Sequence, residues 1–308
     1  MNPFYNDKER RIRALFRVVS FFIISILFLA LPSLIPIEPI EYLVRGVLIV
    51  GTAVLFAVGL DKRRISELGL NLNRTWWTHL LIGCLLGAVA MLFIFVVEWM
   101  FGWVTVTGFG WERSLSSTWW VLFVYFFAKM LMVGLYEEVH ARGYLMLNMI
   151  EGATLSKKYS MAGIVAGVIG SSLIFGLMHA ANPNASLIAI INITLAGVML
   201  AVPYLLTGSL AMSVGIHFTW NFFQAGVFGF PVSGIMVRES VIQITQEGTS
   251  WITGGSFGPE AGVIGLFGMV IVLIGVWLVV RVGPGGIQLH PTFSLLFEEK
   301  MKQNGVEK

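Results

Sequence analysis

Glu137 and Glu138 are adjacent carboxylates inside a long apolar stretch, and Arg142 follows Glu138 by four residues. Residues four apart share a face of a helix, so Glu138 and Arg142 can pair. Adjacent residues point about 100° apart, so Glu137 faces elsewhere. We therefore expect Glu138 and Arg142 to neutralise each other and Glu137 to stay free to take a proton from water. The alternative is a structural ion pair that locks two helices.

His179, and the pair His217 and Asn221, interrupt two later apolar stretches. Small residues before His179 permit a close approach of helices. His217 and Asn221 are four residues apart and share a helical face. Taken singly, each motif is more often a packing residue or a polar clamp between helices. Ionisable groups in apolar segments usually face a bundle interior or a wet cavity, so the three motifs together favour one shared cavity.

The composition sets the fold class in which these residues must be placed. Hydrophobic residues make up 56% of the 308 residues and charged residues only 12%, whereas a soluble domain is about a quarter charged. We expect an all-α polytopic membrane protein, because helices satisfy their own backbone in lipid. A net charge of +3 is too small to favour nucleic-acid binding. The single cysteine, Cys84, excludes an intrachain disulfide.

About eight stretches are long and apolar enough to span a membrane, which takes about 20 residues. They lie near residues 14–35, 40–60, 76–101, 118–150, 159–182, 185–206, 209–228 and 259–281. The fourth is too long for a simple span and should protrude, tilt or break. We expect the catalytic cavity among the fourth, fifth and seventh. The predicted division is an N-terminal arm with three spans (1–110), a catalytic membrane core (111–285) and a polar tail (286–308).

Basic residues mark four segments that are separated by even numbers of predicted spans. These are the N-terminal arm, the loop at Arg63, the loop at Lys157 and Lys158, and the C-terminal tail. All four can be cytoplasmic at once, as the positive-inside rule requires, so both termini are predicted to be cytoplasmic. The loop 229–258 then lies on the other side. No convincing internal repeat is present, which disfavours an inverted-repeat transporter.

Other ionisable residues in the apolar stretches have simpler expectations. Arg45, His79 and Glu98 lie near span ends and are expected to extend their polar groups toward the interface. Lys129 lies deeper, two helical turns before Glu137. It either faces the cavity or pairs with a neighbour.

The ordered motifs Glu-Glu-x-x-x-Arg, Phe-x-x-x-His and His-x-x-x-Asn resemble those of the CAAX-protease and bacteriocin-processing family. This family of intramembrane proteases, also called the ABI family, includes the type II CAAX prenyl endopeptidases. The resemblance covers roughly residues 111–265. Further stretches are typical of bacterial members and imply a prokaryotic cell membrane: Gly208-Ser209-Leu210, Trp220-Asn221-Phe222, the segment 228–234 and the segment 254–260.

The resemblance implies a catalytic role for Glu137, with His179, His217 and Asn221 completing the site. Glu138 and Arg142 match the accompanying motif positions. Ala141 stands where the family commonly has an aromatic residue, which would widen the cavity or change substrate fit.

The function implied is an intramembrane endopeptidase that acts on a membrane-embedded or lipidated, prenylated-type substrate. A water held by Glu137 and His179 would attack the peptide carbonyl, and His217 and Asn221 would stabilise the oxyanion. Glu137 would return the proton to the leaving amine. One alternative is a non-catalytic membrane scaffold or immunity protein. A second is a proton-coupled transporter with Glu137 as its proton site.

A metal is the remaining open question. Glu137, His179 and His217 could hold zinc and leave an open position for water, as a metalloprotease needs. The His-Glu-x-x-His motif of zincins is absent, and a glutamate bound to zinc would need another residue as base. We therefore favour no cofactor and keep zinc as the alternative.

Overall fold

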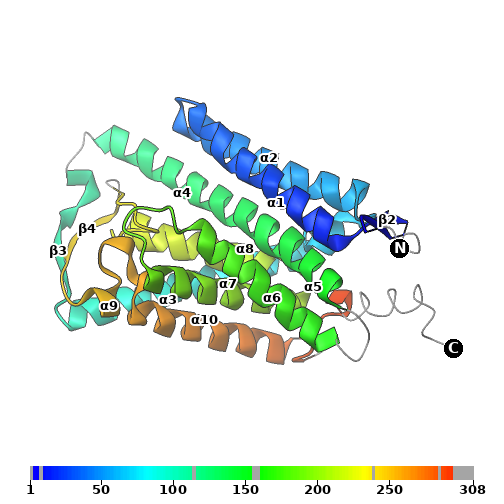
Figure 1. Ribbon diagram of the computed structural model, residues 1–308. Helices are drawn as coiled ribbons and strands as arrows, with labels where there is room; N and C mark the ends of the chain where they lie inside the picture. Colours follow the sequence, from blue (N-terminus) through cyan, green and yellow to red (C-terminus); the bar gives the residue numbers. More distant parts are fainter. Residues whose placement is uncertain are drawn as a thin grey trace.

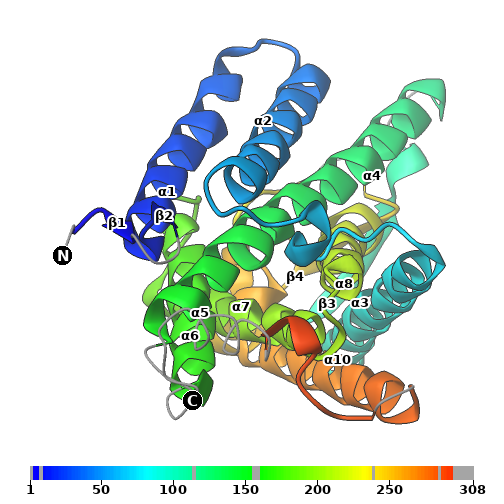
Figure 2. The same cartoon turned by 90° about the vertical axis from the view of Figure 1, so that its right-hand side faces the viewer.

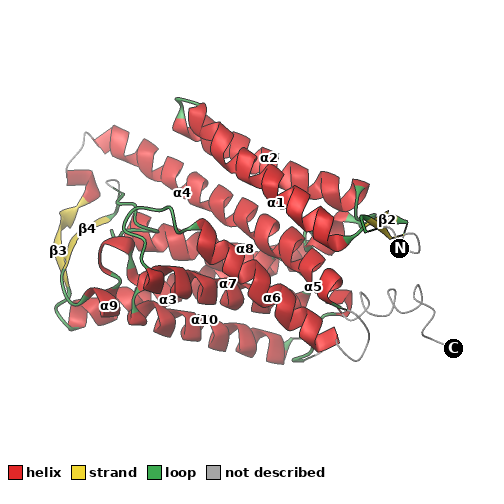
Figure 3. Cartoon of the chain, viewed as in Figure 1, coloured by secondary structure: helices red, strands yellow, loops and turns green. Residues whose placement is uncertain are grey.

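The computed structural model describes residues 3–6, 10–112, 116–154, 160–237, 240–283 and 286–293. It is a bundle of long helices with two small antiparallel sheets outside the bundle (Figures 1 and 3). Over these residues the expected all-α polytopic fold is confirmed. The basic Lys157–Lys158 loop, Lys8 and the lysines of the tail lie outside the described residues.

Seven stretches of helix in the described ranges are long and apolar enough to cross a membrane. The helices that carry them are α1 Ala14–Ala30, α2 Glu38–Gly59, α3 Arg74–Met100, α4 Ser116–Glu138, α6 Ser160–Met178, α7 Leu187–Thr207 and α10 Val263–Val282. A 3-10 turn, Leu31–Leu34, extends α1. α4 continues through a π-helix, Val139–Met146, into α5, Leu147–Ala153. The overlong fourth stretch therefore changes its winding directly after Glu138 and does not simply break.

The stretch 209–228, expected as a full span, is a shorter α8, Ala211–Asn221, followed by a π-helix, Phe222–Val227. It is shorter than the seven long helices, but it still runs from one end of the bundle to the other. The Leu210 amide donates to the Gly69 carbonyl at one end, and the Gly226 carbonyl accepts from the Val241 amide beside β4 at the other. α8 is buried because glycines let it lie against α3. A Cβ on Gly83 would clash with the Met212 carbonyl oxygen, and one on Gly215 would clash with that of Leu80.

The two sheets lie at opposite ends of the bundle (Figure 1). β1 Tyr5–Asn6 pairs with β2 Arg11–Ile12 near the N-terminus. β3 Val104–Phe109 pairs with β4 Ile242–Gln246 at the far end, beside the short α9, Ser250–Thr253. Figure 2 shows α1 and α2 side by side on one flank, with α4 between this pair and α8. α4 is thus placed to present residues to both sides.

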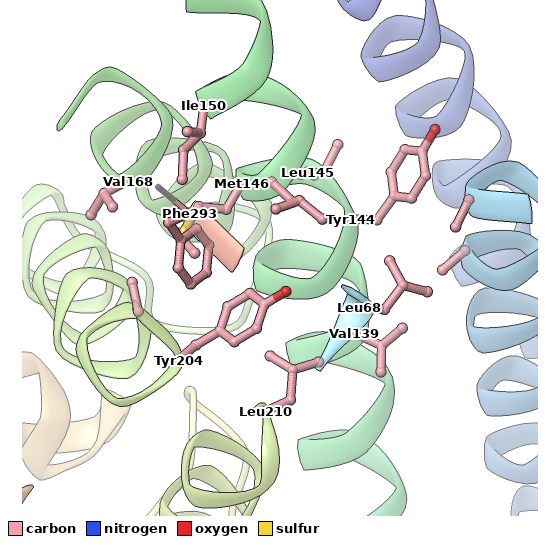
Figure 4. Close-up of a cluster of buried hydrophobic side chains, with 14 of the residues drawn as sticks. Leu68, Val139, Tyr144, Leu145, Met146, Ile150, Val168, Tyr204, Leu210 and Phe293 are labelled. Atoms are coloured by element: carbon pink, nitrogen blue, oxygen red, sulfur yellow. The ribbon is translucent and has the colours of Figure 1, made fainter. Parts of the chain in front are cut away.

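Buried apolar side chains fill the end of the bundle that lies near the N-terminus (Figure 4). Val139, Leu145 and Ile150 come from the helix that follows Glu138, and they pack with side chains such as Tyr204 of α7. Within a bilayer such packing stabilises the bundle through van der Waals contacts between helices. This packing fills the bundle around the helical turns that follow Glu138.

A buried ionic network ties α1 to α5 at the same end. Arg17 lies 2.6 Å from Asp61 and 2.7 Å from Glu151, and Arg63 also pairs with Glu151. Asn148 donates to Asp61 at 2.8 Å. These partners are separated by more than 80 positions in some cases, so sequence spacing gave no sign of them. The proposed division at residues 110 and 111 stays a prediction.

Candidate active site

A cavity of about 400 Å³ lies between α2, α4, α6, α7 and α8, and the loop that follows residue 231 closes one side. Glu137, His179, His217 and Asn221 all line it. The structure therefore brings together the four residues that were expected to share a site, although their assignment to catalysis stays a prediction. His140 lines the cavity as well.

Glu138 is fully buried and forms the expected pair with Arg142. Its Oε1 atom accepts hydrogen bonds from Nη1 of Arg142 at 2.7 Å and from Nδ1 of His217 at 2.8 Å. Arg142 also donates to the Gly197 carbonyl of α7 at 3.2 Å and lies over the Phe175 ring of α6. The pair thus joins α4 to α6, α7 and α8. Glu138 does not line the cavity.

Glu137 faces the cavity, as the 100° step between neighbouring helical residues requires. Its side chain is 21% exposed. Its Oε2 atom has no hydrogen-bond partner among the described residues and lies 3.8 Å from Nε2 of His217. That separation is too long for a direct hydrogen bond. Glu137 and Glu138 are therefore adjacent carboxylates with different surroundings.

The histidine contacts determine which ring nitrogens carry hydrogen. A carbonyl oxygen and a paired carboxylate can only accept, so Nδ1 must be the donor in both rings. His179 donates from Nδ1 to the Phe175 carbonyl at 2.8 Å, and His217 donates to Glu138. Nε2 of each ring is left for other partners. His217 can donate to an oxyanion from Nε2 only when its ring carries a second proton.

His179 reaches the cavity because α6 stops at Met178, one residue earlier. Its ring lies 4.8 Å from that of Phe175, which in turn lies 6.0 Å from the ring of His217. Gly176 lets α6 approach α7 closely, since a Cβ there would clash with Oγ1 of Thr194. The early end of α6 and this close approach place His179 opposite α8.

Two basic residues line the cavity, and only one of them was considered for it from the sequence. Arg45 does not extend to the interface but lines the cavity, with a side chain only 12% exposed. Lys129 both lines the cavity and pairs with Glu38, so both of its expected alternatives hold. The same interfacial expectation was wrong for Glu98, which is fully buried and accepts from Gln246 at 2.7 Å. Hydropathy alone cannot show which face of a helix meets a cavity.

Glu260 lines the cavity together with Glu137. Its Oε1 atom accepts from the Ser233 amide at 2.6 Å, and its Oε2 atom accepts from Gln224. Burial raises the pKa of Glu260 to about 7, against the opposing effect of these hydrogen bonds. It fixes the tight turn at Ser233 and Gly234, where φ is positive at both residues. The family-like segment 254–260 was the only sequence sign of it.

The described residues do not present a metal site. No group of three histidine, cysteine, aspartate or glutamate side chains in these ranges is arranged to hold an ion. The set Glu137, His179 and His217 therefore does not fit zinc in this arrangement.

The comparisons with known proteins agree with the motifs. Residues 118–223, which are 106 of the 308, match the family model described as Type II CAAX prenyl endopeptidase Rce1-like. The matched range holds Glu137, Glu138, Arg142, His179, His217 and Asn221. No curated protein and no solved structure matches the chain. The resemblance to the CAAX-protease family that the motifs indicated is therefore confirmed over residues 118–223.

Proposed function

We propose that the protein is an intramembrane endopeptidase in which Glu137 activates a water molecule. The observation that carries this proposal is the contrast between the two adjacent carboxylates. Glu138 is buried and bound to Arg142 and His217, whereas Glu137 lines the cavity with a partly exposed side chain whose Oε2 atom has no hydrogen-bond partner among the described residues. A general base needs a free oxygen within reach of the proton that it removes.

The first chemical step joins a water oxygen to the peptide carbonyl carbon. Glu137 takes one proton of this water, and His179 is suited to accept a hydrogen bond from the other at its free Nε2. The carbonyl oxygen becomes an oxyanion. Asn221 can donate to it through its amide, and His217 can donate from Nε2 in its doubly protonated form, with Glu138 holding Nδ1. Such fixed donors stabilise charge strongly where water is excluded.

In the second step the carbon–nitrogen bond breaks and the carbonyl re-forms. Glu137 gives its proton to the leaving nitrogen, so the products are a carboxylic acid and an amine. One water is consumed and Glu137 returns to its starting state. No oxidant, reductant or metal takes part in these two steps.

The cavity favours a substrate segment that is largely apolar. Its walls carry Phe126, Phe175 and Trp220 among many aliphatic side chains. A helical peptide hides its carbonyl groups in its own hydrogen bonds, so the segment must be extended at the cleaved bond. A membrane-embedded or lipidated peptide of the prenylated type fits this description.

A comparison of two proteins on a mixture of candidate substrates tests the proposal. Purified wild-type and Glu137→Gln proteins are reconstituted in vesicles with a solubilised host-membrane proteome, and new peptide termini are identified by mass spectrometry. Termini formed only by the wild type support an endopeptidase. Identical termini from both proteins contradict it and favour a membrane scaffold.

A further inference from the structure

A third histidine of the cavity takes no part in the steps above. His140 lines the cavity together with His179 and His217, but it occupies one of the unspecified positions of the Glu-Glu-x-x-x-Arg motif. We propose that its imidazole binds the substrate through a hydrogen bond to a backbone peptide group about one residue away from the cleaved bond. This inference rests on the proposed endopeptidase function and adds a specificity-determining residue to it.

His140 is buried without a hydrogen bond at one of its ring nitrogens. The residue is 4% exposed, and its Nε2 atom is buried with no hydrogen-bond partner among the described residues. The other two cavity histidines each have a fixed partner at Nδ1. Buried polar groups in proteins are nearly always paired, because an unpaired group has lost its water and gained nothing in return. A bound substrate is a partner that the cavity can supply.

The ring of His140 is held from the side of α1. It stacks on Phe21 with the ring centroids 5.3 Å apart and the ring planes 28° apart. Phe21 is itself fully buried, and its ring centroid lies 4.0 Å from that of Tyr144. Stacking fixes the plane of the imidazole but occupies neither nitrogen. A half-turn about the soft χ2 torsion keeps this plane, so the ring can present a nitrogen to a bound group and stay on Phe21.

An extended peptide in this cavity needs partners for its own backbone. Each peptide group carries one N–H and one carbonyl, and both must find partners where neither water nor a helix supplies them. Much of the wall along α4 is apolar and offers none, including Phe126, Met130 and Val133. A neutral imidazole offers one donor and one acceptor, as a peptide group does. His140 and a peptide group of the substrate can therefore satisfy each other.

The position of His140 along the chain decides which peptide group it meets. It is the second residue of the π-helix and follows Glu137 by three residues, so the two side chains share one side of the helix. Three residues correspond to about 4.5 Å at 1.5 Å per residue. A peptide that runs along this helix covers about 3.3–3.6 Å per residue, so the group at His140 lies roughly one residue from the bond over Glu137.

Binding of peptides with one altered backbone group tests this contact without cleavage. The protein is the full-length Glu137→Gln variant in nanodiscs, and the probe is a dye-labelled hexapeptide of leucine and valine. A further set of probes carries an ester in place of one amide, one position at a time. The ester removes the N–H and weakens the carbonyl as an acceptor. We expect the ester at the position that meets His140 to weaken binding about fivefold, as loss of one hydrogen bond predicts.

The substitution His140→Phe, added to the same variant, keeps the ring on Phe21 and removes both nitrogens. In that protein the ester at the sensitive position should bind as tightly as the amide. The melting temperature should equal or exceed that of the parent, because a buried polar group without a partner has been removed. His79→Phe is the matched control. His79 lies on α3 outside the cavity and also has a ring nitrogen, Nδ1, without a partner among the described residues, so the full ester effect should remain.

The contact is overturned if each ester has the same effect with and without His140→Phe, or if no probe binds. A His140→Phe protein that melts well below its parent would also overturn it, since the imidazole would then have a partner inside the protein. Cleavage of the amide probe by the protein with Glu137 intact is scored separately. An ester effect that depends on His140 without any cleavage would leave the contact in place and remove the endopeptidase function. Cleavage that depends on Glu137 without such an ester effect would do the reverse.

Discussion

The Nδ1 atom of His217 lies 2.8 Å from Oε1 of Glu138, although the two residues are 79 positions apart in the sequence. This contact joins the second histidine motif to the carboxylate pair. It also gives Glu138 a second partner besides Arg142. Glu137, the neighbour of Glu138, is left facing the cavity and the other side of the His217 ring.

The buried pair should make a large contribution to stability. Arg142→Ala leaves Glu138 without its cation inside the bundle, which should cost roughly 3–5 kcal/mol. A clear drop in melting temperature in detergent is therefore expected. Arg64→Ala is the control, because Arg64 is 87% exposed beside Glu67 and such pairs contribute about 0–1 kcal/mol. An Arg142→Ala protein that melts like the wild type would show that the pair is not structural.

The basic segments predict the orientation of the chain. Reporter fusions at Arg64 and Lys158 should be cytoplasmic, and a fusion at Gly248 should lie on the opposite side. Gly248 follows β4 at the sheet end of the bundle, where the Glu247 amide donates to the Trp103 carbonyl at 2.7 Å (Figure 1). Any other pattern of reporter signals would break the predicted topology.

The sequence predicted those features that depend on local spacing. Apolar length located the seven long helices, and the four-residue step correctly paired Glu138 with Arg142. The π-helix after Glu138 has no comparable local sign, because α and π turns differ by a single residue in their hydrogen bonds. The burial of α8 could not be predicted, because apolar composition does not distinguish a lipid-facing helix from one buried in protein.

Long-range contacts account for most of what could not be predicted. The link between His217 and Glu138 and the network around Arg17 join segments far apart in the chain. Arg45 lies near the end of a predicted span, and only the packing of α2 against α4 turns it into the cavity. The periodicity of a single sequence shows which residues share a face of a helix, but not which helix packs against that face.

Glu260 should make stability depend on pH in one direction. Burial raises its pKa to about 7, so the folded state keeps a proton that the unfolded chain has lost above its own, lower pKa. Stability from this group is therefore full below about pH 4.5 and is lost as pH rises to about 7, by roughly 3 kcal/mol. As pH rises between these two values, the melting temperature of the wild-type protein should fall relative to that of the Glu260→Gln protein. Melting temperatures that change with pH by the same amount in both proteins would contradict the prediction.

The preference for metal-independent chemistry can be measured directly. Purified protein should contain far less than one zinc per chain and should stay active after exhaustive chelation. His217→Ala should leave the zinc content unchanged. Stoichiometric zinc that is lost in His217→Ala, together with activity restored by added metal, would defeat this prediction and support a ligand set of Glu137, His179 and His217.

The central claim is that Glu137 acts as the general base. It is tested most directly by the rate at which the Glu137→Gln protein cleaves a peptide that the mass-spectrometric comparison of termini has identified. Loss of a general base should lower the rate about 10²–10⁴-fold. The melting temperature should stay close to that of the wild type, because the Glu137 side chain is partly exposed and its Oε2 has no hydrogen-bond partner in the described chain. Glu138→Gln should instead lower the melting temperature, since Glu138 is buried and bound to Arg142 and His217. A folded Glu137→Gln protein that cleaves at the wild-type rate would contradict the account.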